Sequence, residues 1–294
     1  MRILHLDSGR EMRGGQWQAL RLAQGLAQSG IECVVLARAA SPLFRKASEA
    51  GLETHPLSLA ALARFSRRVN LAHAHDARAH TWAALFSAAP VVVSRRVDFP
   101  IRSRWKYSRA AHFLAVSQCV RQRLLAAGVP AERVSVVYDG VPLRAPVPTG
   151  PRVLAPATSD PRKGSDLLAE AARQAGIQVR FSEDLEADLP GSALFVYITR
   201  SEGLGSGVLL AMAAGVPVLA SDVGGLPEIV RHGENGWLTE NQPGAIAAAL
   251  RALLAGPEPA RRLAAAARRT VEEKFSLEIL VRDTIQVYRR VLSC

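Results

Sequence analysis

The stretch from Arg200 to Gly215 reads RSEGLGSGVLLAMAAG and combines the residue types of an anion-binding turn. One acid, Glu202, precedes three alternating glycines, and an apolar segment with helical character follows them. Glycines let a ligand approach the backbone closely, and the free N–H groups at the start of a helix attract negative charge. The segment therefore predicts either a phosphate-binding loop or a tight strand-to-helix turn in which the glycines serve packing only.

The spacing of these glycines excludes three common motifs. A Walker A loop needs GxxxxGK[ST], and no lysine follows the glycines. The dinucleotide-binding fingerprint needs a glycine where Val208 stands. A nucleophile elbow needs glycines two residues to either side of its serine, whereas Ser206 has Leu204 and Val208 there.

Two further loops contain glycine or basic residues at equivalent places. Arg162 and Lys163, in SDPRKGSDLL, follow an apolar run and precede an expected helix, where they could bind a phosphate or remain two exposed charges. Gly14 and Gly15, in RGGQW, lie between the first expected strand and its helix. Ligands of open α/β sheets bind at the carboxyl ends of the strands. The three loops together therefore predict a phosphate-bearing ligand.

Short apolar runs alternate with amphipathic stretches along the whole chain, which predicts doubly wound, parallel α/β sheets. The strands expected in the first half are Arg2–Leu6, Ile31–Ala37, Leu71–Ala74, Val91–Ser94, His112–Ser117 and Val134–Tyr138. Four prolines between Val141 and Pro151 mark a linker. The strands expected after it are Val153–Ala157, Ile177–Phe181, Leu194–Thr199 and Val216–Ala220. We expect two Rossmann-like domains facing across a cleft that holds the ligand.

Composition narrows the setting of the protein. The chain has 294 residues, a net charge of +11 and no apolar run of the length that spans a bilayer. Its start, MRILHLDSG, is not expected to be a secretory leader. Its three cysteines form no CxxC pair or disulfide framework, so we expect a cytoplasmic protein. The positive charge fits a solvated arginine-rich surface, an anionic substrate, or peripheral contact with an anionic inner membrane face. No nucleic-acid module is recognisable, and no nucleic-acid partner is expected.

A histidine-rich segment, HAHD, follows the strand expected at Leu71–Ala74. Alternation along a strand places His73 and His75 on one face, as a metal site would require. The binuclear HxHxDH pattern is broken, however, and no companion acid or cysteine cluster is evident, so no metal is expected. We expect His75 and Asp76 to line the ligand site from the end of their strand.

Charged residues also follow the apolar run APVVVS. Arg95, Arg96 and Asp98 could contact an anionic part of donor or acceptor, or could form an Arg–Asp pair. Trp105 and Tyr107, slightly further along, could form a platform for an acceptor or could pack against a helix. The sequence leaves both pairs of alternatives open.

The run RSEGLGSGVLLAMAAGVPVLASDVGGLPEIV, with HGENGWL after it, resembles the donor-site signature of glycosyltransferase family 4. Weaker similarities, in HAHD, AVSQCVRQRL, VVYDGV and DPRKG, extend over nearly the whole chain. Members of that family are retaining, nucleotide-sugar-dependent enzymes of the GT-B fold. The resemblance implies an acceptor-side domain over residues 1–145, a trimmed donor-binding domain over 146–275, and a last helix over 276–294 that crosses back to the first domain.

The resemblance also assigns expected roles. Glu202 would contact the donor sugar, Lys163 would neutralise the diphosphate, and these two would be the catalytic residues. The residues expected to line the sugar and diphosphate are Gly203, Leu204, Gly205 and Ser206. Gly14 and Gly15 match the loop that closes over donor and acceptor.

Three positions depart from the family pattern. Leu210 stands where a second acid normally binds the ribose. Thr158 stands where an arginine often assists the lysine, a role that Arg162 could take over. Arg96 falls near a position where many relatives carry a histidine beside the sugar.

The implied activity is transfer of a sugar from a nucleoside diphosphate sugar to a hydroxyl of a saccharide or lipid-linked acceptor, in cell-envelope glycan biosynthesis. Positioning and stabilisation of the departing diphosphate would supply the catalysis, with no metal or other cofactor. Three alternatives remain: a non-catalytic nucleotide-sugar-binding relative, an epimerase of the same fold with further acid and base groups, and a nucleic-acid-binding protein.

Overall fold

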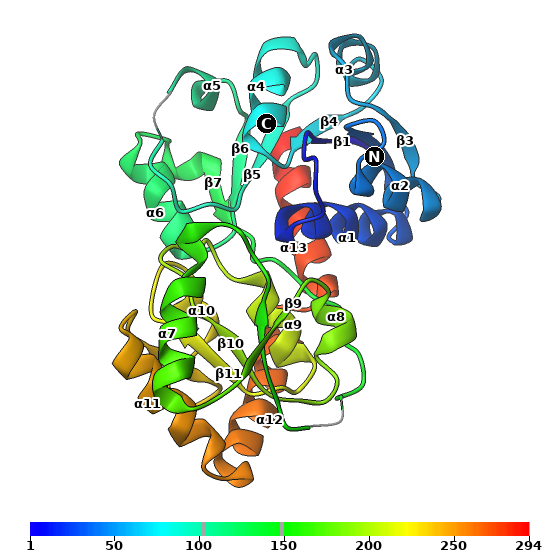
Figure 1. Ribbon diagram of the computed structural model, residues 1–294. Coiled ribbons are helices and arrows are strands. Elements are labelled where there is room, and N and C mark those ends of the chain that lie inside the picture. The colour runs from blue at the N-terminus through cyan, green and yellow to red at the C-terminus, as the bar shows by residue number, and fades with distance from the viewer. Residues whose placement is uncertain (102–103, 148–149, 294) are drawn as a thin grey trace. The chain divides into compact units, whose positions relative to one another are not determined.

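The computed structural model describes residues 1–101, 104–147 and 150–293, and it forms two compact units (Figure 1). Unit 1 comprises Met1–Asp139 and Leu277–Cys294, and unit 2 comprises Gly140–Ser276. The corresponding boundaries expected from the sequence were 145/146 and 275/276. The last helix, α13 (Leu277–Ser293), thus belongs to unit 1. It packs against α1 (Gly14–Gln28), where a Cβ on Gly25 would lie 2.5 Å from Val281.

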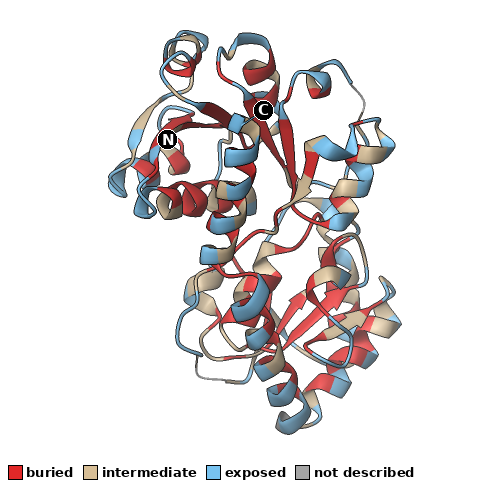
Figure 2. Ribbon diagram, turned by 180° about the vertical axis from the view of Figure 1, so that it is seen from behind, coloured by how far each residue is buried: buried red, intermediate tan, exposed pale blue. Residues whose placement is uncertain are grey.

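Unit 1 is a seven-stranded parallel sheet in the order β3-β2-β1-β4-β5-β6-β7, flanked by helices. Its strands are β1 (Arg2–Asp7), β2 (Glu32–Ala37), β3 (Glu53–Pro56), β4 (Leu71–Ala74), β5 (Val91–Arg95), β6 (His112–Ala115) and β7 (Val134–Val136). Its remaining helices are α2 (Pro42–Glu49), α3 (Leu59–Ser66), α4 (Ala77–Phe86), α5 (Trp105–Ser108), α6 (Gln118–Ala126) and the 3-10 turn η1 (Ala131–Arg133). The central strands are buried, as a parallel sheet with both faces covered requires (Figure 2).

Unit 2 is a five-stranded parallel sheet in the order β12-β11-β10-β8-β9. Its strands are β8 (Arg152–Pro156), β9 (Val179–Ser182), β10 (Ser192–Tyr197), β11 (Val218–Ser221) and β12 (Trp237–Thr239). Its helices are η2 (Pro161–Lys163), α7 (Ser165–Ala175), α8 (Leu185–Asp188), α9 (Ser206–Ala213), α10 (Leu226–Ile229), α11 (Pro243–Leu254) and α12 (Pro257–Lys274). The expectation of two parallel α/β sheets is confirmed.

Candidate functional site

Lys163 is presented by the short turn η2, which connects β8 to α7. The carboxylate of Asp160 caps this turn by accepting a hydrogen bond from the Arg162 backbone N–H at 3.0 Å. Gly164 follows with φ +60°, and a Cβ there would lie 2.9 Å from the side chain and 3.2 Å from the carbonyl oxygen of Ile198, just after β10. The Arg200 N–H donates to the Arg162 carbonyl at 2.7 Å and fastens the turn to that same segment. Glycine is therefore required for α7 to start directly behind Lys163.

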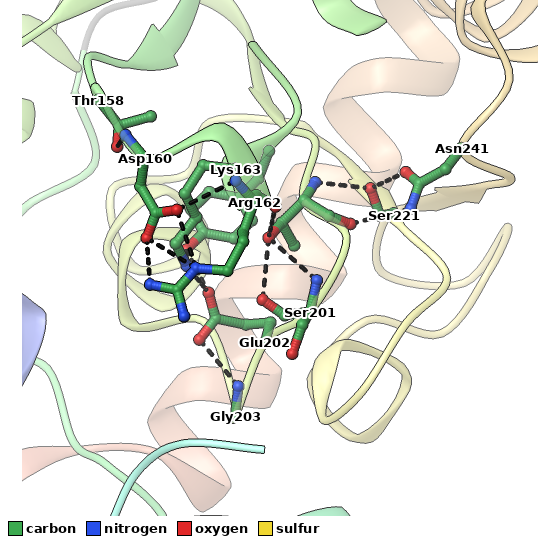
Figure 3. A network of polar contacts seen from close by, with 11 residues as sticks. Thr158, Asp160, Arg162, Lys163, Ser201, Glu202, Gly203, Ser221 and Asn241 are labelled. Carbon is green, nitrogen blue, oxygen red and sulfur yellow. Dashed lines mark hydrogen bonds and ion pairs between the residues drawn. The ribbon is translucent and has the colours of Figure 1, made fainter. Parts of the chain in front are cut away.

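Lys163, Tyr197 and Glu202 form a polar cluster at the carboxyl end of the second sheet, here named the Lys–Tyr–Glu cluster. The Lys163 ammonium lies 2.5 Å from Glu202 Oε2 and 3.2 Å from the Tyr197 hydroxyl oxygen. The Tyr197 hydroxyl donates to the same Glu202 oxygen at 2.5 Å, and the Gly203 N–H donates to Glu202 Oε1 at 2.9 Å. Figure 3 shows the Lys163 and Glu202 side chains directed toward each other. The structure thus brings together the two residues that the sequence assigned to catalysis.

The electrostatics of this cluster leave one group available for a ligand. Burial, and then the negative charge of Glu202, raise the pKa of Tyr197 well above its usual value, so the phenol remains a hydrogen-bond donor. The Glu202 side chain is 13% exposed and that of Lys163 is 31% exposed. An ammonium group has three N–H donors, of which these contacts use two. Lys163 can therefore contact a phosphate oxygen without leaving Glu202.

Two glycine loops pack backbone to backbone beside the cluster. The Gly225 N–H donates to the Glu202 carbonyl at 3.1 Å. A Cβ on Gly224 would lie 2.0 Å from the Glu202 carbonyl oxygen, and one on Gly225 would lie 2.0 Å from that of Gly203. The loop after β11 therefore fixes the position of the loop after β10. The sequence analysis quoted Gly224 and Gly225 but gave them no role.

The glycine loop leads directly into α9. Gly205 adopts φ +104° at the N-cap, and a Cβ there would lie 2.7 Å from Leu226. Gly203, Leu204 and Gly205 are buried, so it is mainly their backbone that can meet a ligand. Ser206 is the first helical residue and is half-buried, as is Leu210 one turn later. The predicted roles of these residues remain predictions.

A second polar network holds the ends of β10 and β11 in place (Figure 3). The Ser221 hydroxyl accepts from the Thr199 N–H at 2.9 Å and donates to Asn241 Oδ1 at 2.7 Å. The Asn241 amide in turn donates to the Thr199 carbonyl at 2.9 Å. This network orients the turn that carries Glu202. Sequence reasoning missed it, because a serine and an asparagine near strand ends give no distinctive pattern.

The remaining predicted donor-site residues lie on the exposed side of η2. The Thr158 hydroxyl accepts from the Asp160 N–H at 3.1 Å and shapes the turn. The Arg162 guanidinium pairs with Asp160 at 2.5 Å and holds the pKa of that carboxyl below its usual range. The charge of Arg162 is therefore compensated within its own turn. To make its predicted contact with a diphosphate, the Arg162 guanidinium would have to bind the diphosphate and Asp160 at the same time.

In unit 1 the carboxyl end of β1 faces the start of α1. Gly14 is the first residue of that helix, and open space surrounds a Cβ on Gly15. Asp7 accepts hydrogen bonds from the Gly9 N–H at 2.8 Å and from the Gln16 amide at 3.1 Å. Burial, and then the charge of Asp76, raise the pKa of Asp7 to about 6. The predicted loop therefore surrounds a buried carboxylate that the sequence analysis did not single out.

Asp76 has a structural role in unit 1. Its Oδ1 accepts from the Arg78 N–H at 2.8 Å and the Ala79 N–H at 3.0 Å, which caps α4. The Ser8 hydroxyl donates to the same oxygen at 2.8 Å, and the Ser8 N–H donates to Oδ2 at 2.5 Å. Asp76 therefore ties the loop after β1 to the start of α4.

The charged residues at the end of β5 and just after it are all engaged within unit 1. Arg96 pairs with Asp139 at 3.0 Å, and both side chains are largely buried. Arg123 pairs with Asp98 at 2.6 Å. Arg95 donates to the Tyr107 hydroxyl at 3.0 Å and to a backbone carbonyl at 2.6 Å. Of the two alternatives drawn from the sequence, the structure shows Arg–Asp pairs, although Arg96 and Asp98 pair with other residues and not with each other.

Three buried imidazoles, those of His5, His73 and His75, have ring nitrogens within 4.8 Å of one another. The strand register aligns His5 with His73, and His5 Nδ1 lies 2.9 Å from His75 Nε2. His73 already contacts the Tyr288 hydroxyl at 2.6 Å and the Ser94 hydroxyl at 2.8 Å. A metal ion bound by all three would have to displace one of these bonds. Sequence reasoning missed His5, which lies alone in an apolar strand.

All three imidazoles are neutral at physiological pH. Burial is the largest cause in each case: it lowers the pKa of His5 to about 3 and those of His73 and His75 well below their usual value. The Arg96 guanidinium, 3.4 Å from His75 Nδ1, lowers all three further. The cluster therefore connects β1, β4, β5 and α13 through hydrogen bonds between neutral groups.

Comparison with known proteins supports the resemblance noted in the sequence. Residues 12–145 match the family model described as "Glycosyltransferase Family 4", and residues 177–270 match "Glycosyl transferases group 1". Alpha-maltose-1-phosphate synthase of Mycolicibacterium smegmatis is 37% identical over 110 residues, which cover 35% of this chain and 28% of that protein. The amylovoran biosynthesis glycosyltransferase AmsK of Erwinia amylovora is 27% identical over 227 residues, 60% of this chain and 56% of that protein.

The matches thus cover between about a quarter and somewhat over half of these relatives' lengths.

Solved structures agree in fold over nearly the whole chain. Anabaena HepE, solved with UDP and glucose, superposes with a TM-score of 0.86 at 17% identity and covers 99% of this chain and 100% of that one. Sucrose-phosphate synthase from Thermosynechococcus elongatus superposes with a TM-score of 0.78 at 19% identity, with 99% of each chain covered. The superpositions show the GT-B fold, and the two family models, over residues 12–145 and 177–270, show that the chain belongs to the family 4 glycosyltransferases.

Proposed function

We propose that the protein is a retaining glycosyltransferase that moves a sugar from a nucleoside diphosphate sugar to a hydroxyl group of a saccharide or lipid-linked acceptor. The observation that carries this proposal is the Lys–Tyr–Glu cluster, which lies beside a glycine loop at the start of α9. The loop offers backbone N–H groups and a helix N-terminus to a diphosphate, and Lys163 adds a positive charge. Glu202 offers carboxylate oxygens to sugar hydroxyls.

In this proposal the bond between the sugar C1 and the diphosphate oxygen breaks, and a bond from C1 to the acceptor oxygen forms. The acceptor proton leaves with the departing diphosphate. Lys163 and the first turn of α9 stabilise the negative charge that develops on the leaving group. Glu202 holds the sugar in place, and Tyr197 and the Gly203 N–H keep its carboxylate oriented. The basic residues compensate the charge, so we propose that the reaction needs no resident metal or other cofactor.

The names of similar proteins support a nucleotide-sugar donor. HepE was solved with UDP-glucose, and AmsK is named for biosynthesis of amylovoran. We therefore propose a role in cell-envelope glycan biosynthesis, with peripheral contact between the protein and an anionic membrane surface. The structure has no helix in its described ranges that is long and apolar enough to cross a membrane.

A non-catalytic nucleotide-sugar-binding protein is the second candidate, and Leu210 is the observation that favours it. Leucine accepts no hydrogen bond, so the ribose contact expected of a family acid is absent at this position. Its half-buried side chain nonetheless leaves the position within reach of a ligand at the helix start. The two candidates differ in whether donor turnover follows donor binding.

A thermal-shift screen of UDP-, GDP-, ADP- and CMP-sugars tests the proposal, because a ligand that binds only the folded state raises the melting temperature. We expect one nucleotide class to stabilise the protein. Lys163→Ala should weaken binding of that class by about 1.5–3 kcal/mol, the range for a hydrogen bond to a charged group. Lys274→Ala, an exposed lysine at the end of α12, is the matched control and should leave binding unchanged. Equal nucleotide binding by the Lys163→Ala variant would refute the assignment.

A further inference from the structure

The connection from the end of β5 to β6, residues 95–109, concentrates positive charge. It contains six Lys or Arg residues against one acid, Asp98, which gives a net charge of +5 in fifteen residues. Asp98 is paired with Arg123 of α6, outside the segment. Arg96 is paired with Asp139, also outside it. The single acid of the segment is therefore not available to its other cations, and a bound anion would offset their charge.

Arg95, the last residue of β5, is held in place by two neutral groups. Its guanidinium donates to the Tyr107 hydroxyl at 3.0 Å and to the Phe99 carbonyl oxygen at 2.6 Å. Its Nε is buried and has no hydrogen-bond partner among the described residues. A guanidinium has five N–H donors, so the N–H on Nε and one N–H on each terminal nitrogen remain unused. Arg95 therefore keeps the capacity to bind the oxygens of a ligand.

Lys106 of α5 brings a second cation to the same edge of the sheet. Its ammonium donates to the Ala77 carbonyl at 3.1 Å and to Thr81 Oγ1 at 3.2 Å, both at the start of α4. One of its three N–H groups remains for a ligand. The Lys106 ammonium lies 5.8 Å from the ring centroid of Tyr107, whose hydroxyl accepts from Arg95. Both cations therefore lie close to the same tyrosine.

Neither cation is neutralised by an acid. In the part of the chain that the structure describes, Arg95 and Lys106 form no ion pair. Burial, and then the positive charge of Arg95, lower the pKa of Lys106, while the charge of Asp76 raises it. Asp76 does not bond to Lys106, because its oxygens accept from Ser8 and from the first turn of α4. Two neighbouring, partly buried cations repel each other, and an anion between them would reduce that cost.

Packing fixes the positions of these cations. Helices α4 and α5 lie side by side (Figure 1), and His80 Nε2 of α4 lies 3.0 Å from the Lys106 carbonyl oxygen. The buried Tyr107 ring stacks on Phe113 with a centroid distance of 5.4 Å. Of the two alternatives drawn from the sequence, Tyr107 thus packs within unit 1, whereas Trp105, next to Lys106, is 45% exposed. The cations are presented from a fixed scaffold.

We propose that Arg95 and Lys106 bind an acidic group of the acceptor, and that the acceptor is an acidic saccharide with a carboxylate or a phosphate; this inference rests on the proposed function. The planar N–H groups of Arg95 match two oxygens of either group, and Lys106 adds a point charge. The donor diphosphate has its own cation, Lys163, in unit 2. The site lies at the carboxyl edge of the first sheet, where the neighbouring strand β4 leads to His75 and Asp76.

Isothermal titration calorimetry of the full-length protein tests this proposal with acidic saccharides and the neutral forms of the same sugars. Tetragalacturonate is compared with its methyl ester, and mannose 6-phosphate with mannose. The acidic member of at least one pair should bind roughly tenfold more tightly than the neutral member, the lower end of the range for a hydrogen bond to a charged group. The pair that shows the preference distinguishes a carboxylate from a phosphate. The preference should decrease as ionic strength rises.

Two variants separate recognition of the acidic group from a structural role. Lys106→Gln should weaken binding of the acidic member roughly tenfold and leave binding of the neutral member unchanged. Arg95→Lys keeps the charge but removes the planar arrangement of donors, so it should weaken binding of the acidic member several-fold. A purely structural role would weaken binding of both members alike. Melting curves verify that each variant is folded, because Arg95 also holds Tyr107.

Exposed cations elsewhere provide the controls. Arg68→Gln removes an exposed arginine after α3, at the amino edge of the same sheet, and Lys274→Gln removes an exposed lysine of unit 2. Both variants should bind the acidic saccharides like wild type. Equal binding of the acidic and neutral members in both pairs, or an acidic preference that Lys106→Gln and Arg95→Lys leave unchanged, would overturn the proposal. Double-stranded DNA that displaces the acidic saccharide and binds more tightly would also overturn it.

These titrations contain no sugar donor, so they are independent of the proposed reaction. Absence of donor turnover would refute the transferase activity and leave the acidic preference measurable. Absence of an acidic preference would refute the assignment of Arg95 and Lys106 and leave donor binding and turnover unaffected.

Discussion

The substitution Glu202→Gln separates the structural role of this residue from its proposed role in holding the sugar. The Glu202 carboxylate accepts hydrogen bonds from Lys163, Tyr197 and the Gly203 N–H. Glutamine keeps the volume but has one acceptor oxygen, and its NH2 group cannot accept a hydrogen bond from the ammonium. A hydrogen bond to a charged group contributes about 1.5–3 kcal/mol. Because Lys163 is 31% exposed, solvent weakens the pair, and we expect a loss of about 2 kcal/mol in unfolding free energy.

A nucleoside diphosphate should restore part of this loss. Lys163, released from Glu202, can give all its donors to the diphosphate, so the affinity for the free nucleotide should stay equal or increase. Turnover of the sugar donor should fall by far more than the affinity for nucleotide changes, because the donor sugar loses its contact with the Glu202 carboxylate. Melting curves with and without nucleoside diphosphate, together with donor turnover, measure both effects. Glu234→Gln, in an exposed pair with Arg231, is the control and should change stability by less than about 1 kcal/mol. A Glu202→Gln variant with wild-type melting, nucleotide response and turnover would refute the reasoning.

Three further substitutions or conditions test other parts of the account. Leu210→Glu should tighten donor binding by about 1–3 kcal/mol if the position borders the ribose. If melting curves of this variant instead show a lower melting temperature that added nucleotide does not restore, Leu210 belongs to the core. Gly225→Ala should abolish donor binding or destabilise unit 2, because the added Cβ would lie 2.0 Å from a backbone oxygen. The control Gly244→Ala, where nothing lies within 4 Å of the added Cβ, should be neutral or stabilising in calorimetry. Equal behaviour of the two variants would contradict the close packing of the loops. Unit 1 should lose stability as pH falls below about 6.5, because the unfolded chain takes up protons that the buried histidines do not; the loss is roughly 1.4 kcal/mol per pH unit for each histidine whose folded pKa is lowered. Asp7 acts in the opposite direction, because its pKa is raised to about 6, and it offsets one such contribution between about pH 6 and 4. The histidines concerned are His5, His73, His75, His80 and His112. Calorimetry at pH 7, 6 and 5 should show the transition of unit 1 moving more than that of unit 2, and equal shifts would contradict the burial of these imidazoles.

Much of the fold could be predicted because buried parallel strands are continuous apolar runs. The run VVVS gave β5 and the run ALFV gave most of β10, and the proline-rich linker separated the two sheets. β3 was missed because its sequence, Glu53–Pro56, is polar and lies at the edge of the first sheet. An edge strand with little burial carries no apolar pattern to detect.

The donor-site elements were predictable where the backbone itself imposes the residue type. Gly164 and Gly205 adopt positive φ beside close neighbours. Such positions favour glycine strongly, so they can be recognised from the sequence. The partners supplied by distant segments were not predictable. Tyr197 lies within the expected strand Leu194–Thr199 and belongs to no motif, and Asn241 lies 42 residues from the carbonyl it binds. His5 became recognisable as part of a cluster only through its strand register with His73.

The measurement that tests the central claim most directly is donor turnover by the purified protein, followed by NMR with the nucleotide sugar that stabilises it most. Water can serve as the acceptor, so the natural acceptor need not be known. The account predicts release of nucleoside diphosphate and a sugar whose first-formed anomer has the configuration of the donor, with turnover that survives EDTA and is lost in Lys163→Ala and Glu202→Gln. Stoichiometric donor binding without any turnover, in water or with saccharide acceptors, would contradict the proposed transferase activity. The protein would then be a nucleotide-sugar-binding protein without catalysis.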